Sequence, residues 1–365
     1  MDTHTLQEPP SPLAKLRKKL PSTGNYPYVT ARVRAKRALL LTWDTYAKLL
    51  VMDINEITRF LGESRYKKEI TELGLLYTGF ELTEHALNKN RDETYQQILK
   101  FSDGDLHDML AAYLEREDTW NLRTILRGIL NHVPADEITQ TLRAGGRYPP
   151  DHWKHLIDDS TTIDDAITSL QDTPYYEPLH SLLPDFTLAT AENRLETHYY
   201  THLLATIHPN NEPNRLFLTY IRSEIDLVNL KTLFMTKYEN VEPDKIKDTI
   251  IPGGTIPDKT LQRMTEAPDF THFLTELEKL PVYDHIRAEA ETIPKTQSLA
   301  TTIRDLEKDH LLQATKSSYL HPLSILPIID YLTRKRIEVQ NLRILARGKE
   351  KGLPQDTIRS LLVVP

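Results

Sequence analysis

The stretch YLEREDTWNLRTILRG, residues 113–128, contains a pattern that the chain repeats twice more. The related stretches are YIRSEIDLVNLKTL at residues 220–233 and YLTRKRIEVQNLRILARG at residues 331–348. In each, an acid stands three residues before an asparagine. A leucine follows the asparagine directly, and a base follows the leucine. An isoleucine comes seventeen residues after each asparagine. Because self-similarity of this length is typical of repeat architectures, the pattern predicts several related helical units.

Helix geometry gives each position of the pattern an expected place. The repeated residues are the acids Asp118, Asp226 and Glu338, the asparagines Asn121, Asn229 and Asn341, the bases Arg123, Lys231 and Arg343, and the isoleucines Ile138, Ile246 and Ile358. At 100° per residue, the leucine after the asparagine lies on an apolar stripe that faces the core. The acid and the asparagine lie at the edge of that stripe, where they can bond each other or a neighbouring helix end. The base lies off the stripe, where it can line a shared cavity or face water.

A fainter copy of the pattern begins the chain, with Leu40 in the asparagine position and Ile57 seventeen residues later. It lacks a leading helix, whereas the last copy stops after its second helix, so the two fragments could together complete one unit. A further helix is expected before each clear copy, carrying Asp92, Glu196 or Glu307 as a structural partner of the repeat bases.

These observations predict an all-α fold of three related helical domains around a pseudo-threefold axis, with the chain ends near each other. The expected divisions are a flexible extension at 1–24, one repeat at 25–105, a second at 106–208, and a third at 209–365 that includes a partial fourth copy of the pattern.

Composition supports the helical interpretation. Only 12 of 365 residues are glycine, and several prolines stand where helices are expected to begin, at Pro134, Pro243, Pro257 and Pro354. The chain has no cysteine, which excludes disulfides, iron–sulfur clusters and thiol nucleophiles. The sequence shows neither a signal peptide nor an apolar run of about 18–20 residues, so we expect a soluble, intracellular protein.

Charge is distributed unevenly along the chain. Residues 1–37 carry eight bases and two acids, while the whole chain has a net charge of −7. A basic N-terminal arm on an acidic body argues against nucleic acid as a partner, because phosphate binding needs a broad basic face. The arm is compatible with an anionic membrane surface, with an acidic protein, or with a solvated tail.

Candidate chemistry is sparse. His198 and His202 have the spacing of two helical metal ligands, but no acid follows His198 as in zinc proteases. The glycine pairs at 145–146 and 253–254 lack a phosphate-loop lysine and are interpreted as turns. No nucleophile motif occurs, so we expect no catalytic residue, no metal, no cofactor and no small-molecule substrate.

Three features together resemble a known family: NYPYVTARVR at residues 25–34, WNLRTILRG at residues 120–128, and the recurring Asn-Leu-Arg/Lys. The chain from Asn25 onward resembles the C subunit of the archaeal A-type ATP synthase, a relative of the d subunit of the eukaryotic V-type ATPase. Residues 1–24 lie outside the common pattern, and Leu40 departs from it.

The resemblance implies a funnel-shaped, non-catalytic coupling part of a rotary motor. Such proteins sit peripherally on the cytoplasmic face of the membrane, against the proteolipid rotor ring, and receive the central stalk in their cavity during ion-driven ATP synthesis or hydrolysis. The expected framework and cavity-wall residues are Arg32, Arg34, Arg116, Asn121, Arg123, Arg222, Asn229, Lys231, Asn341 and Arg343. The alternatives are a helical-repeat scaffold that binds a peptide or protein, and a metal-dependent hydrolase built on His198 and His202.

Overall fold

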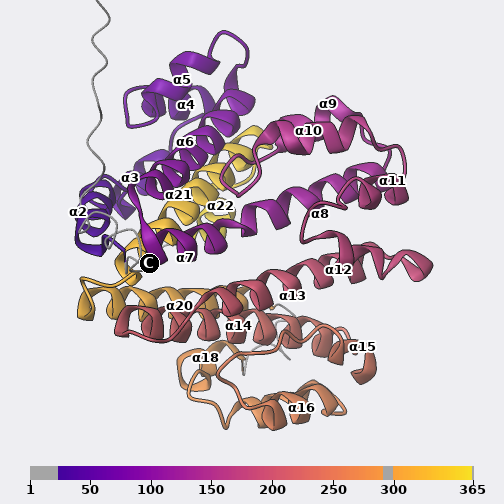
Figure 1. Ribbon diagram of the computed structural model, residues 1–365. Coiled ribbons are helices and arrows are strands. Elements are labelled where there is room, and N and C mark those ends of the chain that lie inside the picture. Colours follow the sequence, from indigo (N-terminus) through magenta and orange to yellow (C-terminus); the bar gives the residue numbers. More distant parts are fainter. Residues whose placement is uncertain (1–23, 291–298, 364–365) are drawn as a thin grey trace, which may run out of the picture.

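The computed structural model describes residues 24–290 and 299–363, and within them every regular element is a helix (Figure 1). The expected all-α class is therefore confirmed. The extension predicted at 1–24, with Lys15, Arg17, Lys18 and Lys19, lies outside the described residues except for Gly24. In the described part of the chain, no helix combines the length and the apolarity needed to cross a membrane.

Two hydrophobic cores are each built by a continuous stretch of chain. The first lies among α8 (Arg116–Leu130), α9 (Ala135–Thr141), α10 (Pro150–Asp158), α11 (Ile163–Thr168), α12 (Tyr176–His180), a 3₁₀ turn (Leu183–Asp185) and α13 (Leu188–Thr206). The second lies among α14 (Glu212–Tyr238), α15 (Pro243–Lys247), α16 (Asp258–Glu266), α17 (Phe270–Leu277), α18 (Tyr283–Ala290) and α20 (Ala300–Leu320).

A third core combines the two ends of the chain. It joins α21 (Leu326–Glu350) and α22 (Gln355–Leu361) to α3 (Trp43–Leu49), α4 (Ile54–Gly62), α5 (Lys67–Leu73) and α6 (Gly79–Phe101). Figure 1 shows the yellow α21 beside the purple α6, although more than 200 residues separate them. The expectation that the first and last fragments complete one unit agrees with this shared core.

A fourth, central core holds these parts together. It contains residues of α2 (Tyr26–Arg37) and α7 (Gly104–Leu114) together with the parts of α6, α13, α14 and α21 that lie against them. Tyr113, Phe217 and Ile328 are almost completely buried there. Because this core draws on all three peripheral groups of helices, their packing is interdependent.

Helix starts follow the local sequence. Pro134, Pro257 and Pro354 occupy the N-cap positions of α9, α16 and α22, and Pro243 is the first residue of α15. Proline costs nothing there because the first helical N–H groups have no partner within the helix. The predicted helix-starting role of these prolines is confirmed.

One turn recurs after each long helix of the repeat. The residue eleven positions after each asparagine has positive φ: 54° at His132, 54° at Asn240 and 66° at Gly352. This left-handed residue ends the helix and directs the chain back over it. A Cβ added at Gly128 would lie 2.4 Å from Ile138 Cδ1, so that glycine lets the following short helix approach closely. Gly348 contacts Ile358 in the same way, whereas the second copy has Thr236 at the glycine position and still buries its isoleucine, Ile246.

The faint first copy does not share this structure. Leu40 lies beyond the end of α2, in the connection to α3, rather than inside a long helix. Leucine cannot form the side-chain hydrogen bonds that asparagine forms in the other copies. Only Ile57 behaves as the pattern predicts, because it is fully buried in the core that joins the chain ends.

Candidate functional site

Each repeat asparagine forms the same pair of hydrogen bonds, which we call the asparagine bridge. Its side-chain amide donates to a backbone carbonyl 22 residues later, and its amide oxygen accepts from the N–H of that same residue. The residues bridged are Arg143 by Asn121, Ile251 by Asn229 and Val363 by Asn341, at distances of 2.7–2.9 Å. All three asparagines are at most 1% exposed. They are framework residues that fix the returning segment to the long helix.

The repeat acid holds the loop that follows the bridged residue. Asp118 accepts the backbone N–H groups of Arg147 and Tyr148, and Asp226 accepts those of Thr255 and Ile256. The acid and the asparagine therefore bond a returning segment, which is one of the outcomes expected from their place at the edge of the stripe.

The glycine pairs make this approach possible. A Cβ added at Gly146 would lie 2.2 Å from Asp118 Oδ1, and one at Gly254 would lie 2.1 Å from Asp226 Oδ1. Both pairs lie in turns, as predicted, and the second glycine also makes room for a carboxylate. Burial raises the pKa of Asp118 to about 7, although its two backbone hydrogen bonds act in the opposite direction.

Glu338 occupies the same position but has different partners. Its carboxylate accepts the backbone N–H of Leu41 at 2.7 Å and the hydroxyl of Tyr66 at 2.6 Å. Lys335 lies 3.1 Å from it and also donates to Tyr66. Burial opposes ionisation of Glu338, but the charges of Lys335 and Arg65 and the tyrosine bond outweigh burial and lower its pKa. Residues of the N-terminal segment thus supply to Glu338 the contacts that a following loop supplies to Asp118 and Asp226.

A cavity of about 370 Å³ lies between the long helices α8, α14 and α21 and the helices α13 and α20. Four of its acids are matched with four bases. Glu117 pairs with Arg143 at 2.9 Å, Glu224 with Arg116 at 3.0 Å, and Glu196 with Arg123 at 2.7 Å, while Glu307 pairs with Lys231. The interpretation of Glu196 and Glu307 as partners of the repeat bases is confirmed.

The position five residues before each asparagine also faces this cavity, with Arg116, Glu224 and Arg336 in the three copies. Arg116 contacts both carboxylate oxygens of Glu224, at 3.0 and 3.2 Å, and donates to the Tyr199 hydroxyl at 2.7 Å. Burial disfavours the charge of Glu224, but Arg116 outweighs it and lowers the pKa of that carboxyl. One charge pair therefore connects α8 to α14 across the cavity wall.

The structure brings some of the predicted site residues together and separates others. Arg116, Arg123 and Lys231 line the cavity, whereas Arg343 pairs with Glu84 on α6 outside it. Arg222 and Arg34 are exposed and outside the cavity wall.

Two bases of the predicted N-terminal arm are engaged by the fold itself. The Arg32 guanidinium lies 4.3 Å from the centre of the Phe101 ring, and Arg37 pairs with Asp330 at 2.9 Å. Part of the basic arm therefore fixes α2 to the body.

The structure does not confirm the expected pairing of Asp92 with a repeat base. Asp92 instead bonds its neighbour Arg91 and accepts the N–H of Ala144, and the repeat base Arg343 pairs with Glu84.

The two histidines with metal-ligand spacing have other contacts. His202 contacts Glu115 at 2.9 Å, with His198 stacked beside it. Among residues 24–290 and 299–363, no group of three metal-ligating side chains gathers there or elsewhere.

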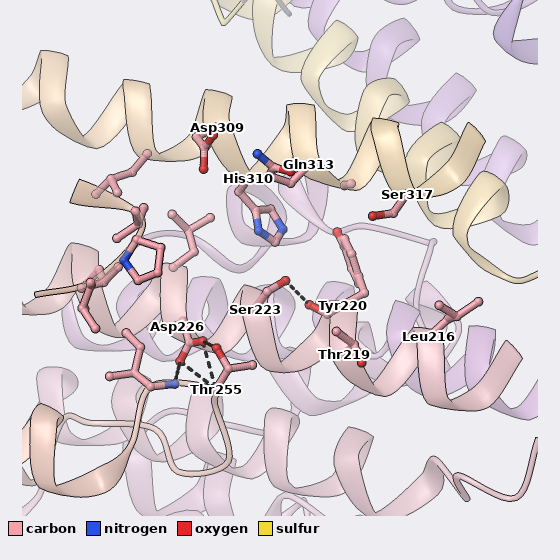
Figure 2. Close-up of a pocket in the computed structure, with 18 of the residues that line it drawn as sticks. Leu216, Thr219, Tyr220, Ser223, Asp226, Thr255, Asp309, His310, Gln313 and Ser317 are labelled. Atoms are coloured by element: carbon pink, nitrogen blue, oxygen red, sulfur yellow. Dashed lines mark hydrogen bonds between the residues drawn. The ribbon is translucent and has the colours of Figure 1, made fainter. Parts of the chain in front are cut away.

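A larger cavity of about 610 Å³ lies between α14 and α20 (Figure 2). Most of its wall is apolar, and both of its carboxylates have partners: Asp226 is bound to the loop at Thr255, and Asp309 contacts His285 at 2.7 Å. His310 points into it from α20 and also lines the charged cavity, and its buried Nε2 has no hydrogen-bond partner among the residues that the structure describes. Burial lowers the pKa of His310.

Sequence reasoning named Arg116 for the cavity wall but missed Glu224 and Arg336, which occupy the same position, five residues before the asparagine, in the other two copies. The pattern nevertheless contained a signal for it. That position lies seven residues before the repeat base, which is close to two helical turns, so both project from the same helix face.

Comparison with known proteins gives a consistent result over nearly the whole chain. Residues 29–361 match the family model described as ATP synthase (C/AC39) subunit. The A-type ATP synthase C subunit of Methanosarcina acetivorans is 39% identical over 355 residues, 97% of each chain. That of Methanococcoides burtonii is 38% identical, covering 94% of this chain and 95% of the relative. That of Archaeoglobus fulgidus is 34% identical, covering 92% and 96%.

Proposed function

The chain belongs to the ATP synthase (C/AC39) subunit family, and from this premise we propose that it is the non-catalytic rotor component that couples a proteolipid ring to the central stalk. It sits peripherally on the cytoplasmic face of the membrane and transmits torque between ion flow in the membrane and the catalytic head. The three helical units are arranged around a pseudo-threefold axis, and the charged cavity is the socket for the stalk.

The observation that carries this proposal is the charged cavity itself. Its wall combines apolar side chains with ion pairs contributed by several helices, including Arg116–Glu224 and Arg123–Glu196. A socket that can be empty must not expose a large apolar surface to water, and charged side chains keep such a wall hydrated.

Stiffness supports the same role. Each long helix is connected to its returning segment by an asparagine bridge, and the shared central core joins the three groups of helices. A part that transmits torque has to resist local opening, and buried hydrogen bonds spread over the molecule raise the cost of such opening. These contacts therefore favour a role in which the chain moves as one rigid part.

The direct test is a pair of binding measurements. The purified chain should retain the purified central-stalk proteins of its complex, and separately the detergent-solubilised proteolipid ring, in pull-down experiments. Binding of neither would exclude the rotor role and favour the scaffold alternative. Genes for ring, stalk and head proteins should also neighbour its own gene.

The ring contact has its own test. Replacing Lys15, Arg17, Lys18 and Lys19 by glutamine should weaken ring binding at low salt, because we propose that these bases interact with lipid headgroups or with the loops of the ring. The matched control replaces the exposed lysines Lys154, Lys245, Lys247 and Lys259 by glutamine. Equal ring binding by both variants would return the N-terminal bases to the role of a solvated tail.

A further inference from the structure

The charges of the cavity wall do not balance. Its bases number one more than its acids, and the surplus base is Arg336. Within residues 24–290 and 299–363, its guanidinium has no hydrogen bond and no ion pair, whereas Arg116, Arg123, Arg143 and Lys231 each pair with an acid. Arg336 therefore presents donors to the cavity that the described residues do not satisfy.

The repeat explains how this surplus arises. The equivalent position in the three copies holds Arg116, Glu224 and Arg336, so this group of residues contains two guanidinium groups and one carboxylate. Arg116 occupies both oxygens of that carboxylate and has Tyr199 as a further partner. Glu224 and Arg116 still act electrostatically on Arg336, but neither contacts it within hydrogen-bonding distance. A second carboxylate is what this cluster lacks.

The chemistry of the position selects the ligand. A guanidinium presents a planar fork of N–H donors that matches a carboxylate, and a partly buried location strengthens such a pair because water screens it less. Trp120, Val228 and Ile337 line the same cavity, and such apolar surface suits a protein segment better than a small hydrated anion.

We propose that Arg336 is the docking residue for the carboxylate of an acidic side chain on the central-stalk segment that enters this cavity. This inference rests on the proposed function, because it names the group through which the stalk engages the socket. The pair completes the charge balance of the wall only when the stalk is present.

The first test compares the affinity of the purified stalk proteins for the wild-type chain and for Arg336→Gln. We expect binding to weaken by at least about 30-fold, because the stalk carboxylate would be buried without a partner. Arg336→Lys should recover part of the loss. Arg347→Gln, on the same helix but outside the cavity, makes the same charge change and should bind like wild type.

The outcomes separate the two proposals. If the wild-type chain does not bind the stalk, the rotor role fails and the docking residue fails with it. If the wild-type chain and Arg336→Gln bind equally well, the docking inference alone is wrong.

A second measurement uses the unmodified protein, so it does not depend on how a variant folds. Phenylglyoxal should label Arg336 in the free chain, as located by peptide mass spectrometry, and bound stalk should suppress this labelling. Unchanged labelling in the complex would overturn the inference. Equal protection by inorganic phosphate alone, at matched ionic strength, would assign the site to a free anion and would overturn it as well.

Discussion

The helices that carry the copies of the pattern at residues 220–233 and 331–348, called the second and third units below, satisfy the same acid position in different ways. In the second unit, Asp226 bonds the backbone of a loop that follows it in one continuous chain. In the third, Glu338 instead bonds Leu41 and Tyr66 from the N-terminal segment. The asparagine bridge three residues later is the same in both units.

The difference shows that the third unit is closed without a covalent connection. Its acid pairs with the buried Lys335 and accepts the Tyr66 hydroxyl, so side chains supply contacts that backbone N–H groups supply to Asp226. Unfolding of either chain end therefore removes partners from the other. We expect the stability of this unit to depend more on the charged cluster of Glu338, Lys335 and Tyr66 than the continuous units depend on their acids. Four predictions test this comparison of the units.

The largest effect should follow from Glu338→Ala. Lys335 is fully buried, so removing its carboxylate leaves an unpaired ammonium and should cost about 3–5 kcal/mol of unfolding free energy. Asp226→Asn keeps an acceptor for the loop and should cost about 1–3 kcal/mol. Urea denaturation measures both, and equal losses would contradict the proposed dependence on the charged cluster.

Removing the asparagine bridge should affect the two units equally. Asn229→Leu and Asn341→Leu each leave a buried N–H and a buried carbonyl without partners, so each should cost about 2–4 kcal/mol. The exposed Asn55→Leu serves as control and should change stability by less than about 0.5 kcal/mol. A loss confined to one of the two bridge variants would show that the bridges are not equivalent.

Acid titration should distinguish the acids. Asp118 has a raised pKa of about 7, so its contribution to stability is fully present below the unfolded pKa near 4 and is lost as pH rises through about 7. Glu338 has a lowered pKa, so its contribution is present above its unfolded pKa and is lost on acidification.

Urea denaturation between pH 4 and 7 measures the Asp118 contribution. The unfolding free energy of wild type relative to Asp118→Asn should fall by at most about 1.4 kcal/mol per pH unit as pH rises. A pH-independent difference would contradict the raised pKa.

The smallest effects concern the left-handed residue that ends the long helix in each clear copy of the pattern. A Cβ at Gly352 would meet no atom within 4 Å, so Gly352→Ala tests backbone strain alone and should cost about 1 kcal/mol. His132 has the same left-handed conformation, and His132→Gly should stabilise the protein by about 0.5–1 kcal/mol. Thermal unfolding would show opposite shifts, and shifts of the same sign would contradict a common turn geometry.

Much of the framework could be predicted from sequence because it depends on local spacing. The helical class, the starts at Pro134 and Pro354, and the recurrence of Asn121, Asn229 and Asn341 all come from periodicities within one helix or between it and the next. The partners of the asparagines could not be predicted, since a residue 22 positions away is reached only through the intervening turn.

The candidate site was predictable only in part. The spacing correctly associated the repeat bases with acids on the preceding helices at Glu196 and Glu307, but it wrongly chose Asp92 for the third pair. Helix packing decides such a pair, because a shift of two turns along α6 replaces one acid by another.

The sequence by itself determined the helices, the repeat and the side chains that fix each returning segment, because these depend on contacts between residues close in the chain. Only the tertiary structure decided which residues of the two chain ends bond each other, such as Tyr66 and Glu338, and that Arg116, Glu224 and Arg336 meet at one cavity. The physical reason is that the pairing of charges depends on distance in space. Only the packing of α8, α14 and α21, which are far apart in sequence, decides that Arg116 pairs with Glu224 and that Arg336 does not.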